Sequence, residues 1–365
     1  MIKPDIVRNI GIVYAGGTIS SLATKGGYRI GGIKVDLIHE LQNHLAKPLS
    51  NIIIASSSFA YTGLSENITT THQSLIARKV EEGLRGGSHG VVVTHGTDSM
   101  EHTARYLQSN FGEKLVTKNQ KIIITGANND LADPRTDAWE NLEFALKSAV
   151  SMQEAGVYIA FHNILIPADT VVKEPYDGVQ MNYVDSGSQR FNELSAKQHT
   201  KVELLLEQIE RLLPSDRYPH AVIEYRVNRV VNNHDELLKQ ITPKTKSILF
   251  TLYHSGTANT ENSRISVSRL TKKLRQDKGI ISFGVTENGE PVDLHLYETS
   301  VKLREAGMVP LYNMLRPVAK EKLIRLSHLP SPQIILQMLT KVGSEIDESQ
   351  IEHADIRTLL KLYNK

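Results

Sequence analysis

The 365-residue chain contains no cysteine. This absence excludes disulfides, zinc–thiolate sites, iron–sulfur clusters and cysteine nucleophiles. If the protein performs nucleophilic catalysis, its nucleophile is a serine, a threonine, a lysine, a carboxylate or an activated water.

The chain also lacks an excess of either charge and has no long hydrophobic run. The 42 Lys and Arg residues nearly balance 40 Asp and Glu residues, for a net charge of +2. A balance so close to neutral gives no reason to expect a nucleic-acid or membrane-surface partner. No stretch approaches the roughly 18 apolar residues of a membrane span, and the first residues lack a signal-peptide core. These absences predict a soluble, cytoplasmic protein.

The composition is that of an ordinary globular protein, with 40% hydrophobic and 22% charged residues. At about 150 residues per domain, the length predicts two domains. In the first half we expect strands at 9–14, 51–55, 90–94, 121–125 and 157–161, and helices near 69–85, 98–111 and 133–153. Continuous β-branched strands separated by helices predict a parallel sheet covered on both faces, which is a doubly wound α/β fold.

The second half predicts a further α/β unit of the same kind. Residues 192–213 have a helical pattern that ends before Pro214. Strands are expected at 221–225, 246–253 and 279–285, with helices near 262–276, 298–306 and 331–343. We therefore predict a larger N-terminal α/β domain at 1–190, a helical linker at 191–220, a smaller C-terminal α/β domain at 221–345 and a C-terminal helix at 346–365.

Hydroxyl side chains and glycines follow the first strand of the first domain. The segment Ala15 to Ser21 reads AGGTISS, and its two glycines allow a tight turn that presents Thr18 beyond the strand end. A nucleotide-binding loop or a simple turn is the alternative. The spacing matches neither G-x-G-x-x-G nor the P-loop pattern, so a hydroxyl nucleophile remains a candidate.

The loop after the third expected strand holds Thr97 and Asp98, in the segment THGTDSME. Asp98 also suits the N-cap of the following helix, which is an ordinary structural role. His95 is a candidate base, although a histidine satisfied within its loop is more common. Lys173, after the fifth expected strand, is either a solvated surface charge or a functional amine.

Taken together, these loops resemble the bacterial-type L-asparaginases and glutaminase-asparaginases. AGGTIS is similar to the family's first signature, TGGTI, and VVVTHGTDSMEHTA is similar to the second, with Ser99 in place of a threonine. Ser65-Glu66-Asn67 matches the substrate-binding segment, and Lys173 matches the lysine of the Thr-Asp-Lys set. The resemblance covers residues 8–340 and continues less tightly through YHSGTAN and TSVKLREAGMVPLYNM.

The resemblance implies an amidohydrolase with two catalytic sets. Thr18 takes the position of the primary nucleophile, with Tyr28 as its partner on a glycine-flanked lid. Thr97, Asp98 and Lys173 take the positions of the second set, in which a desolvated lysine acts as the base and Thr97 N–H suits the oxyanion. Thr18 and Thr97 both remain candidates for the first attack, and Thr18 is favoured.

The family's substrate contacts also map onto this chain. The resemblance implies that Glu66 and Asp98 bind the substrate ammonium, that Ser65 binds its carboxylate, and that the carbonyl of Ala127 accepts a hydrogen bond from the leaving amide nitrogen. It implies L-asparagine as the substrate and no metal or cofactor. Glu66 resembles the glutaminase-asparaginase branch, which predicts L-glutamine as a second substrate.

Family members assemble as dimers of dimers, so the resemblance implies a homodimer or a homotetramer. A neighbouring subunit's second domain then completes each site. Thr257, Asn259 and Glu290 are the candidates for this role.

The sequence departs from the family pattern in several places. Ala15 replaces a threonine, Lys173 lacks the usual preceding glycine and threonine, and the 190–220 connection is longer than usual. The spacing of Thr18 and Tyr28 resembles the cytosolic type I branch, whereas Glu66 indicates the other branch.

Two other functions remain open. The amidase subunit of an archaeal-type tRNA-dependent amidotransferase shares these signatures, but it usually has an extra N-terminal domain for which the start of this chain leaves no room. A non-catalytic amino-acid-binding regulator is expected to have lost Thr18, Thr97, Asp98 or Lys173, and all four are present.

Overall fold

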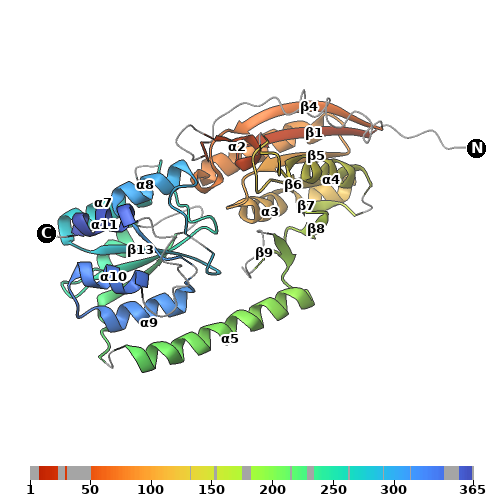
Figure 1. The fold of residues 1–365 in the computed structure, drawn as a ribbon. Helices are drawn as coiled ribbons and strands as arrows, with labels where there is room; N and C mark the ends of the chain where they lie inside the picture. The colour runs from red at the N-terminus through yellow and green to blue at the C-terminus, as the bar shows by residue number, and fades with distance from the viewer. Residues whose placement is uncertain are drawn as a thin grey trace, which may run out of the picture. The chain divides into compact units, whose positions relative to one another are not determined.

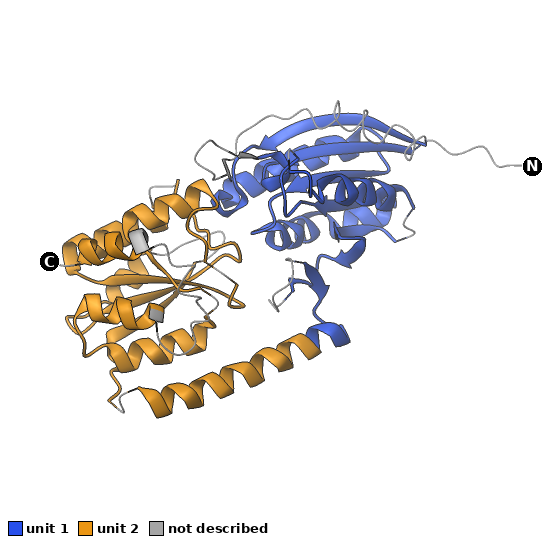
Figure 2. Cartoon of the chain, in the orientation of Figure 1, with its two compact units in different colours: residues 1–174, 179–192 blue, residues 175–178, 193–365 orange. Residues whose placement is uncertain are grey.

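The computed structural model describes residues 8–23, 29–30, 51–131, 133–151, 154–174, 182–213, 216–227, 234–261, 264–290, 292–312, 314–340 and 353–363. The chain forms two compact units (Figure 2). The first comprises residues 1–174 and 179–192, and the second comprises residues 175–178 and 193–365. This division into compact units does not test the domain bounds expected from the sequence, with a linker at 191–220, and those bounds stay a prediction.

The first unit is built on a six-stranded sheet with the order β4-β1-β5-β6-β7-β8 (Figure 1). Its strands are β1 (Arg8–Ala15), β4 (Ile52–Tyr61), β5 (Gly90–His95), β6 (Lys121–Thr125), β7 (Gly156–Phe161) and β8 (Ile164–Pro167). All neighbours pair in parallel except β8, which runs antiparallel to β7. Short antiparallel pairs join β2 (Leu22–Ala23) to β3 (Arg29–Ile30) and β9 (Val171–Lys173) to β10 (Tyr183–Asp185). The predicted α/β fold is confirmed, with an antiparallel strand added at one edge.

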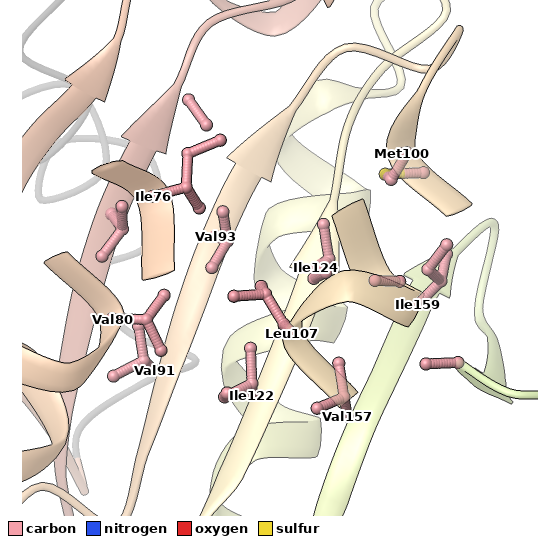
Figure 3. Close-up of a cluster of buried hydrophobic side chains, with 14 of the residues drawn as sticks. Ile76, Val80, Val91, Val93, Met100, Leu107, Ile122, Ile124, Val157 and Ile159 are labelled. Carbon is pink, nitrogen blue, oxygen red and sulfur yellow. The ribbon is translucent and has the colours of Figure 1, made fainter. Parts of the chain in front are cut away.

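Helices cover both faces of this sheet because successive strand residues point to opposite sides. The helices are α2 (Thr70–Arg85), α3 (Met100–Lys118) and α4 (Ala138–Ser151). Val91 and Val93 belong to the core beneath α2 and α3, whereas Val92 belongs to the core beneath α4. Figure 3 shows the first of these cores, with side chains of Ile76, Val80, Leu107, Ile122, Ile124, Val157 and Ile159 around the two valines. The continuous β-branched strands are therefore buried on both faces.

The strand order reverses at β1. Strand β4 pairs on one side of β1, and β5 pairs on the other. Ligands of open α/β sheets bind beyond the carboxyl ends of the strands at such a switch point. The residues that follow β1 and β5 include Thr18 and Thr97, so topology marks the same two loops as the motifs.

Several elements of the first unit differ from the expected bounds. β4 is an edge strand rather than a fully buried one, and Ile53 is 52% exposed. Helix α3 continues past Gly112 because Leu115 packs in the core. Helix α4 begins at Ala138 rather than near 133 because the preceding residues form turns, in which Thr136 N–H donates to Asp133 O at 2.9 Å. Strands β8, β9 and β10 were not expected.

The second unit contains a parallel four-stranded sheet in the order β11-β12-β13-β14. Its strands are β11 (Val222–Arg226), β12 (Ser247–Leu252), β13 (Ile281–Thr286) and β14 (Val309–Pro310). One core packs α6 (His234–Gln240), α7 (Val267–Lys278) and α8 (Glu298–Ala306) on the sheet. The opposite core involves α5 (Gln189–Leu212), α9 (Arg316–Leu326), α10 (Ser331–Thr340) and α11 (His353–Tyr363). Both faces of this second sheet are therefore covered, as expected.

Local signals explain where the second unit differs from the predicted elements. Helix α7 begins at Val267 because Ser266 caps it, accepting a hydrogen bond from Arg269 N–H. Gly279 ends the helix with φ of 64°, so the following strand begins at Ile281 rather than at residue 279. Helices α6 and α9 and strand β14 were not expected. Residues 341–343, 346–352 and 364–365 of two expected helices lie outside the described residues. Within the described ranges, no helix has the length and hydropathy needed to cross a bilayer.

Candidate active site

The loop after β1 contacts the loop after β5 through their backbones. Thr18 begins a short 3-10 turn, η1 (Thr18–Ser20), directly after this loop. Gly17 has φ of 86°, and a Cβ placed on it would lie 2.2 Å from the backbone N and Cα of Gly96. Only glycine permits this conformation and this approach. The hydroxyl-bearing Thr18, which is 5% exposed, is therefore held at the junction of the two loops.

A third loop, after β4, joins the same junction. Ser65 and Glu66 lie in the turn η2 (Ser65–Asn67), and each is 3% exposed. The Ser99 hydroxyl donates to Ser65 O at 2.8 Å. A Cβ placed on Gly96 would lie 2.4 Å from Ser65 Oγ, so Ser65 packs directly on the glycine of the second signature.

Asp98 and Lys173 form a buried ion pair. Lys173 Nζ donates to Asp98 Oδ1 at 3.3 Å, although 75 residues separate the two in the chain. Their side chains are 6% and 1% exposed. Burying two charges costs several kcal/mol that their attraction does not reliably return, so such a pair is weak evidence of a stabilising role. A buried carboxylate next to a buried amine is instead typical of groups that carry out acid–base chemistry.

The β9-β10 hairpin positions Lys173. Tyr183 lies opposite Lys173 in the antiparallel ladder, and its hydroxyl donates to Thr97 O at 2.6 Å. The hairpin thereby ties the lysine to the loop of the second signature. Sequence reasoning missed Tyr183, because the short segment NYVD has no motif and its strand was not expected.

The loop after β6 brings Ala127 beside the first signature. The side chain of Ala127 packs with Ile19, the residue after Thr18, and with Ala138. A Cβ on Gly126 would lie 2.5 Å from His95 O and 3.4 Å from Thr97 Cγ2, so this loop also lies against the loop after β5. Ala127 is fully buried.

The structure thus brings together the loops that hold most of the predicted site residues. These are Thr18, Ser65, Glu66, Thr97, Asp98, Ala127 and Lys173, all of them buried. Their catalytic and binding roles stay predictions. Tyr28, the predicted lid residue, lies outside the described residues. Among the residues that are described, no group of three or more His, Cys, Asp or Glu side chains could hold a metal ion.

Residues 9–204 match the family model described as "Asparaginase, N-terminal". This segment contains both signatures, the Ser65 turn and Lys173. The chain belongs to the asparaginase family.

Curated relatives of this asparaginase-family chain include subunits of glutamyl-tRNA(Gln) amidotransferases. One from Methanococcus maripaludis is 23% identical over 359 residues, which cover 95% of this chain and 82% of that protein. The corresponding protein of Sulfolobus acidocaldarius is 25% identical over 92% of this chain and 75% of its own length. Among solved structures, the L-asparaginase of Thermococcus kodakarensis is 20% identical, with a TM-score of 0.39 over 93% of this chain and 99% of that one. L-asparaginase I of Vibrio cholerae is 19% identical, with a TM-score of 0.42 over 93% and 99%.

The three candidates for a subunit-crossing role lie in the second unit of this asparaginase-family chain. Thr257 and Asn259 follow β12 and are buried, and Glu290 follows β13. Glu290 Oε1 lies 2.6 Å from His254 Nδ1 in a buried pair that sequence reasoning missed. Burial opposes ionisation of Glu290, but His254 and further hydrogen bonds outweigh it and lower the pKa of Glu290. The segment YHSGTAN, which contains His254, resembled the family pattern, but nothing in the sequence indicated that His254 pairs with Glu290.

His95, in the second signature, is a buried neutral ring. Burial lowers its pKa from 6.5 to about 4, despite a contact at 2.8 Å between Nδ1 and Gly96 O and the charge of Glu101. Nε2 has no hydrogen-bond partner among the described residues. At neutral pH the ring therefore packs as an uncharged part of the loop.

This burial predicts an acid-sensitive stability. Between pH 6.5 and pH 4 the His95 ring is protonated in the unfolded chain but stays neutral in the folded chain. The free energy of unfolding therefore decreases as the pH falls through this window. At about 1.4 kcal/mol per unit the loss totals about 3 kcal/mol. His95→Gln is expected to remove this component in urea unfolding measured across the window. His220→Gln, which removes an exposed imidazole, is the control. Parallel curves for wild type and His95→Gln would contradict the prediction.

Proposed function

We propose that the chain hydrolyses the side-chain amide of L-asparagine to L-aspartate and ammonia, using Thr18 as the nucleophile. The observation that carries the proposal is the buried Asp98–Lys173 pair, next to loops that contact the Thr18 turn through Gly17 and Gly96. A buried hydroxyl, carboxylate and amine within one group of loops match the needs of amide hydrolysis: a nucleophile, its activation and control of protons.

The chemistry proceeds through an ester on Thr18. The Thr18 hydroxyl oxygen attacks the side-chain amide carbon, its proton is passed on to the amide nitrogen that will leave, and the N–H of Thr97 stabilises the oxyanion. Collapse breaks the C–N bond, and the nitrogen leaves as ammonia after taking a proton. Water then attacks the ester carbon, with Lys173 and Asp98 handling its proton, and breakage of the C–O bond releases L-aspartate and restores Thr18.

Recognition of the substrate follows from the charges around the Thr18 turn. Glu66 and Asp98 provide negative charge for the substrate ammonium, and both are buried. Ser65 provides a hydroxyl for the carboxylate. Glu66 supports L-glutamine as a second substrate, because this residue resembles the branch that accepts both amino acids.

The assembly belongs to the same proposal. We propose a homodimer or homotetramer in which Thr257, Asn259 and Glu290 reach the site of a neighbouring copy. The contact with His254 holds the Glu290 carboxylate in one position, which supports Glu290 as one of these candidates.

A second candidate is the amidase subunit of a tRNA-dependent amidotransferase, favoured by the names of the curated relatives. In that role the same site releases ammonia for use by a partner subunit. Both candidates share the nucleophile and the ion pair, so they differ in substrate and in dependence on a partner.

An ammonia-release assay on the purified full chain tests the proposal. Saturable release from L-asparagine by the chain alone is expected, with slower release from L-glutamine and none from D-asparagine. Release from L-glutamine alone would favour the amidotransferase role. Calorimetric binding of L-asparagine without any ammonia would identify a non-catalytic binding protein and overturn the proposal.

A further inference from the structure

The carboxylate of Asp137 is the centre of a network around the loop after β6. Asp137 directly precedes α4. Its Oδ1 accepts hydrogen bonds from Asn128 N–H at 2.9 Å and from Asn129 N–H at 3.1 Å. Its Oδ2 accepts from Asn141 Nδ2 at 3.0 Å and lies 3.1 Å from His162 Nε2. Four donors thus converge on one carboxylate, more than capping α4 requires.

Two hydrogen bonds, one of them made by Asp137 itself, fix the peptide units on either side of Ala127. The N–H of Asn128 and the carbonyl of Ala127 belong to one planar unit, whose two polar ends point in opposite directions when the bond is trans. Because Asp137 binds the N–H end, the Ala127 carbonyl points away from Asp137. On the other side, Asn141 Nδ2 donates to Gly126 O at 3.1 Å, so Asn141 joins Asp137 to the preceding unit.

The β7-β8 turn completes the network. His162 N–H donates to Asn141 Oδ1 at 2.8 Å, while the His162 ring contacts Asp137. His162 has φ of 47° and Asn163 has φ of 60°, the left-handed conformations of a tight hairpin turn. Burial opposes ionisation of Asp137, but His162 and the N–H groups of Asn128 and Asn129 outweigh it and lower the pKa of Asp137 below 3.8. The carboxylate is therefore charged at neutral pH.

From this geometry we infer that Asp137 is a positioning residue that aims the carbonyl of Ala127 at the leaving amide nitrogen of the substrate. The inference rests on the proposed function and extends it to a residue that contacts no substrate. A charged acceptor on the N–H also increases the negative charge on the carbonyl oxygen of the same unit, which strengthens its hydrogen bond to the leaving group. The packing of Ala127 against Ile19 keeps this unit next to the Thr18 turn.

The matched substrates L-asparagine and L-aspartate β-methyl ester test the inference. The ester has no N–H on its leaving group, so it makes no use of the Ala127 carbonyl. Asp137→Ala is expected to lower kcat for L-asparagine by about 10²-fold, the cost of a misplaced catalytic contact. Its kcat for the ester is expected to stay within a few-fold of wild type. Asp137→Asn, which keeps one acceptor oxygen, is expected to lose less.

Controls separate positioning from folding. Glu143→Gln removes a carboxylate of α4 itself, which pairs with Lys147 at the surface, and is expected to leave turnover of both substrates unaffected. Calorimetry with L-aspartate is expected to give the wild-type Kd for Asp137→Ala, because the product has no amide nitrogen. Equal losses for amide and ester, or no loss for either, would overturn the inference while the proposed function stands. A wild-type chain that cleaves neither substrate would overturn both.

Discussion

Thr18→Ala is expected to abolish ammonia release from L-asparagine, with a decrease in kcat of at least about 10³-fold. The substitution removes the hydroxyl that forms the ester and leaves only the positioning and oxyanion contributions. Thr18 directly follows Gly17, whose backbone contacts Gly96, so the loop backbone is held independently of the Thr18 side chain. The fold is therefore expected to survive. Ammonia release and circular dichroism of the purified variant check both parts.

Two controls sharpen this experiment. Thr18→Ser keeps a hydroxyl and is expected to retain measurable turnover. Thr103→Ala removes an equally small, buried threonine of α3 whose hydroxyl has no partner among the described residues, and is expected to keep full activity. Wild-type turnover in Thr18→Ala would exclude Thr18 as the nucleophile and leave Thr97 as the remaining threonine candidate.

Lys173→Met is expected to lose both activity and stability. It removes the proposed base, for a decrease in kcat of about 10³-fold or more, and it takes the lysine charge away from Asp98, whose side chain is 6% exposed. Breaking a buried pair by removing one partner costs about 3–5 kcal/mol. Ammonia release and urea unfolding measure the two effects separately.

A double variant separates these two effects. Adding Asp98→Asn to Lys173→Met removes the carboxylate charge that Lys173 balanced, so most of the lost stability is expected to return while activity stays absent. Arg217→Met breaks an exposed pair with Glu321 at 2.9 Å and is expected to change stability by less than about 1 kcal/mol. Substantial activity in either Lys173 variant would remove Lys173 from the catalytic set.

Much of the fold was predictable because local pattern and burial agree. Apolar runs such as Lys121 to Thr125 became strands with the expected ends, since each is buried on both faces. Predictions failed where long-range packing outweighed local signals. The helix expected near 98–111 continues to Lys118, because Leu115 is buried in the core.

The site was predictable only in part. The two signatures identified Thr18, Thr97 and Asp98, but Lys173 was placed by resemblance alone, and its ion pair with Asp98 depends on a hairpin that no pattern predicted. Asp137 was not identified from the sequence: it lies inside the helix expected near 133–153, and its role depends on a turn between β7 and β8 that lies 25 residues away in the chain.

The sequence by itself determined which chemistry is available: no thiol, little net charge, and hydroxyls, a carboxylate and a lysine after buried strands. It also determined the α/β character of the chain, because strand and helix periodicities are local. Only the tertiary structure decided which loops meet, since strand order and pairing bring together residues far apart in the chain. The reversal at β1 places the loops after β1, β4 and β5 against one another, and the β9-β10 hairpin brings Lys173 to Asp98.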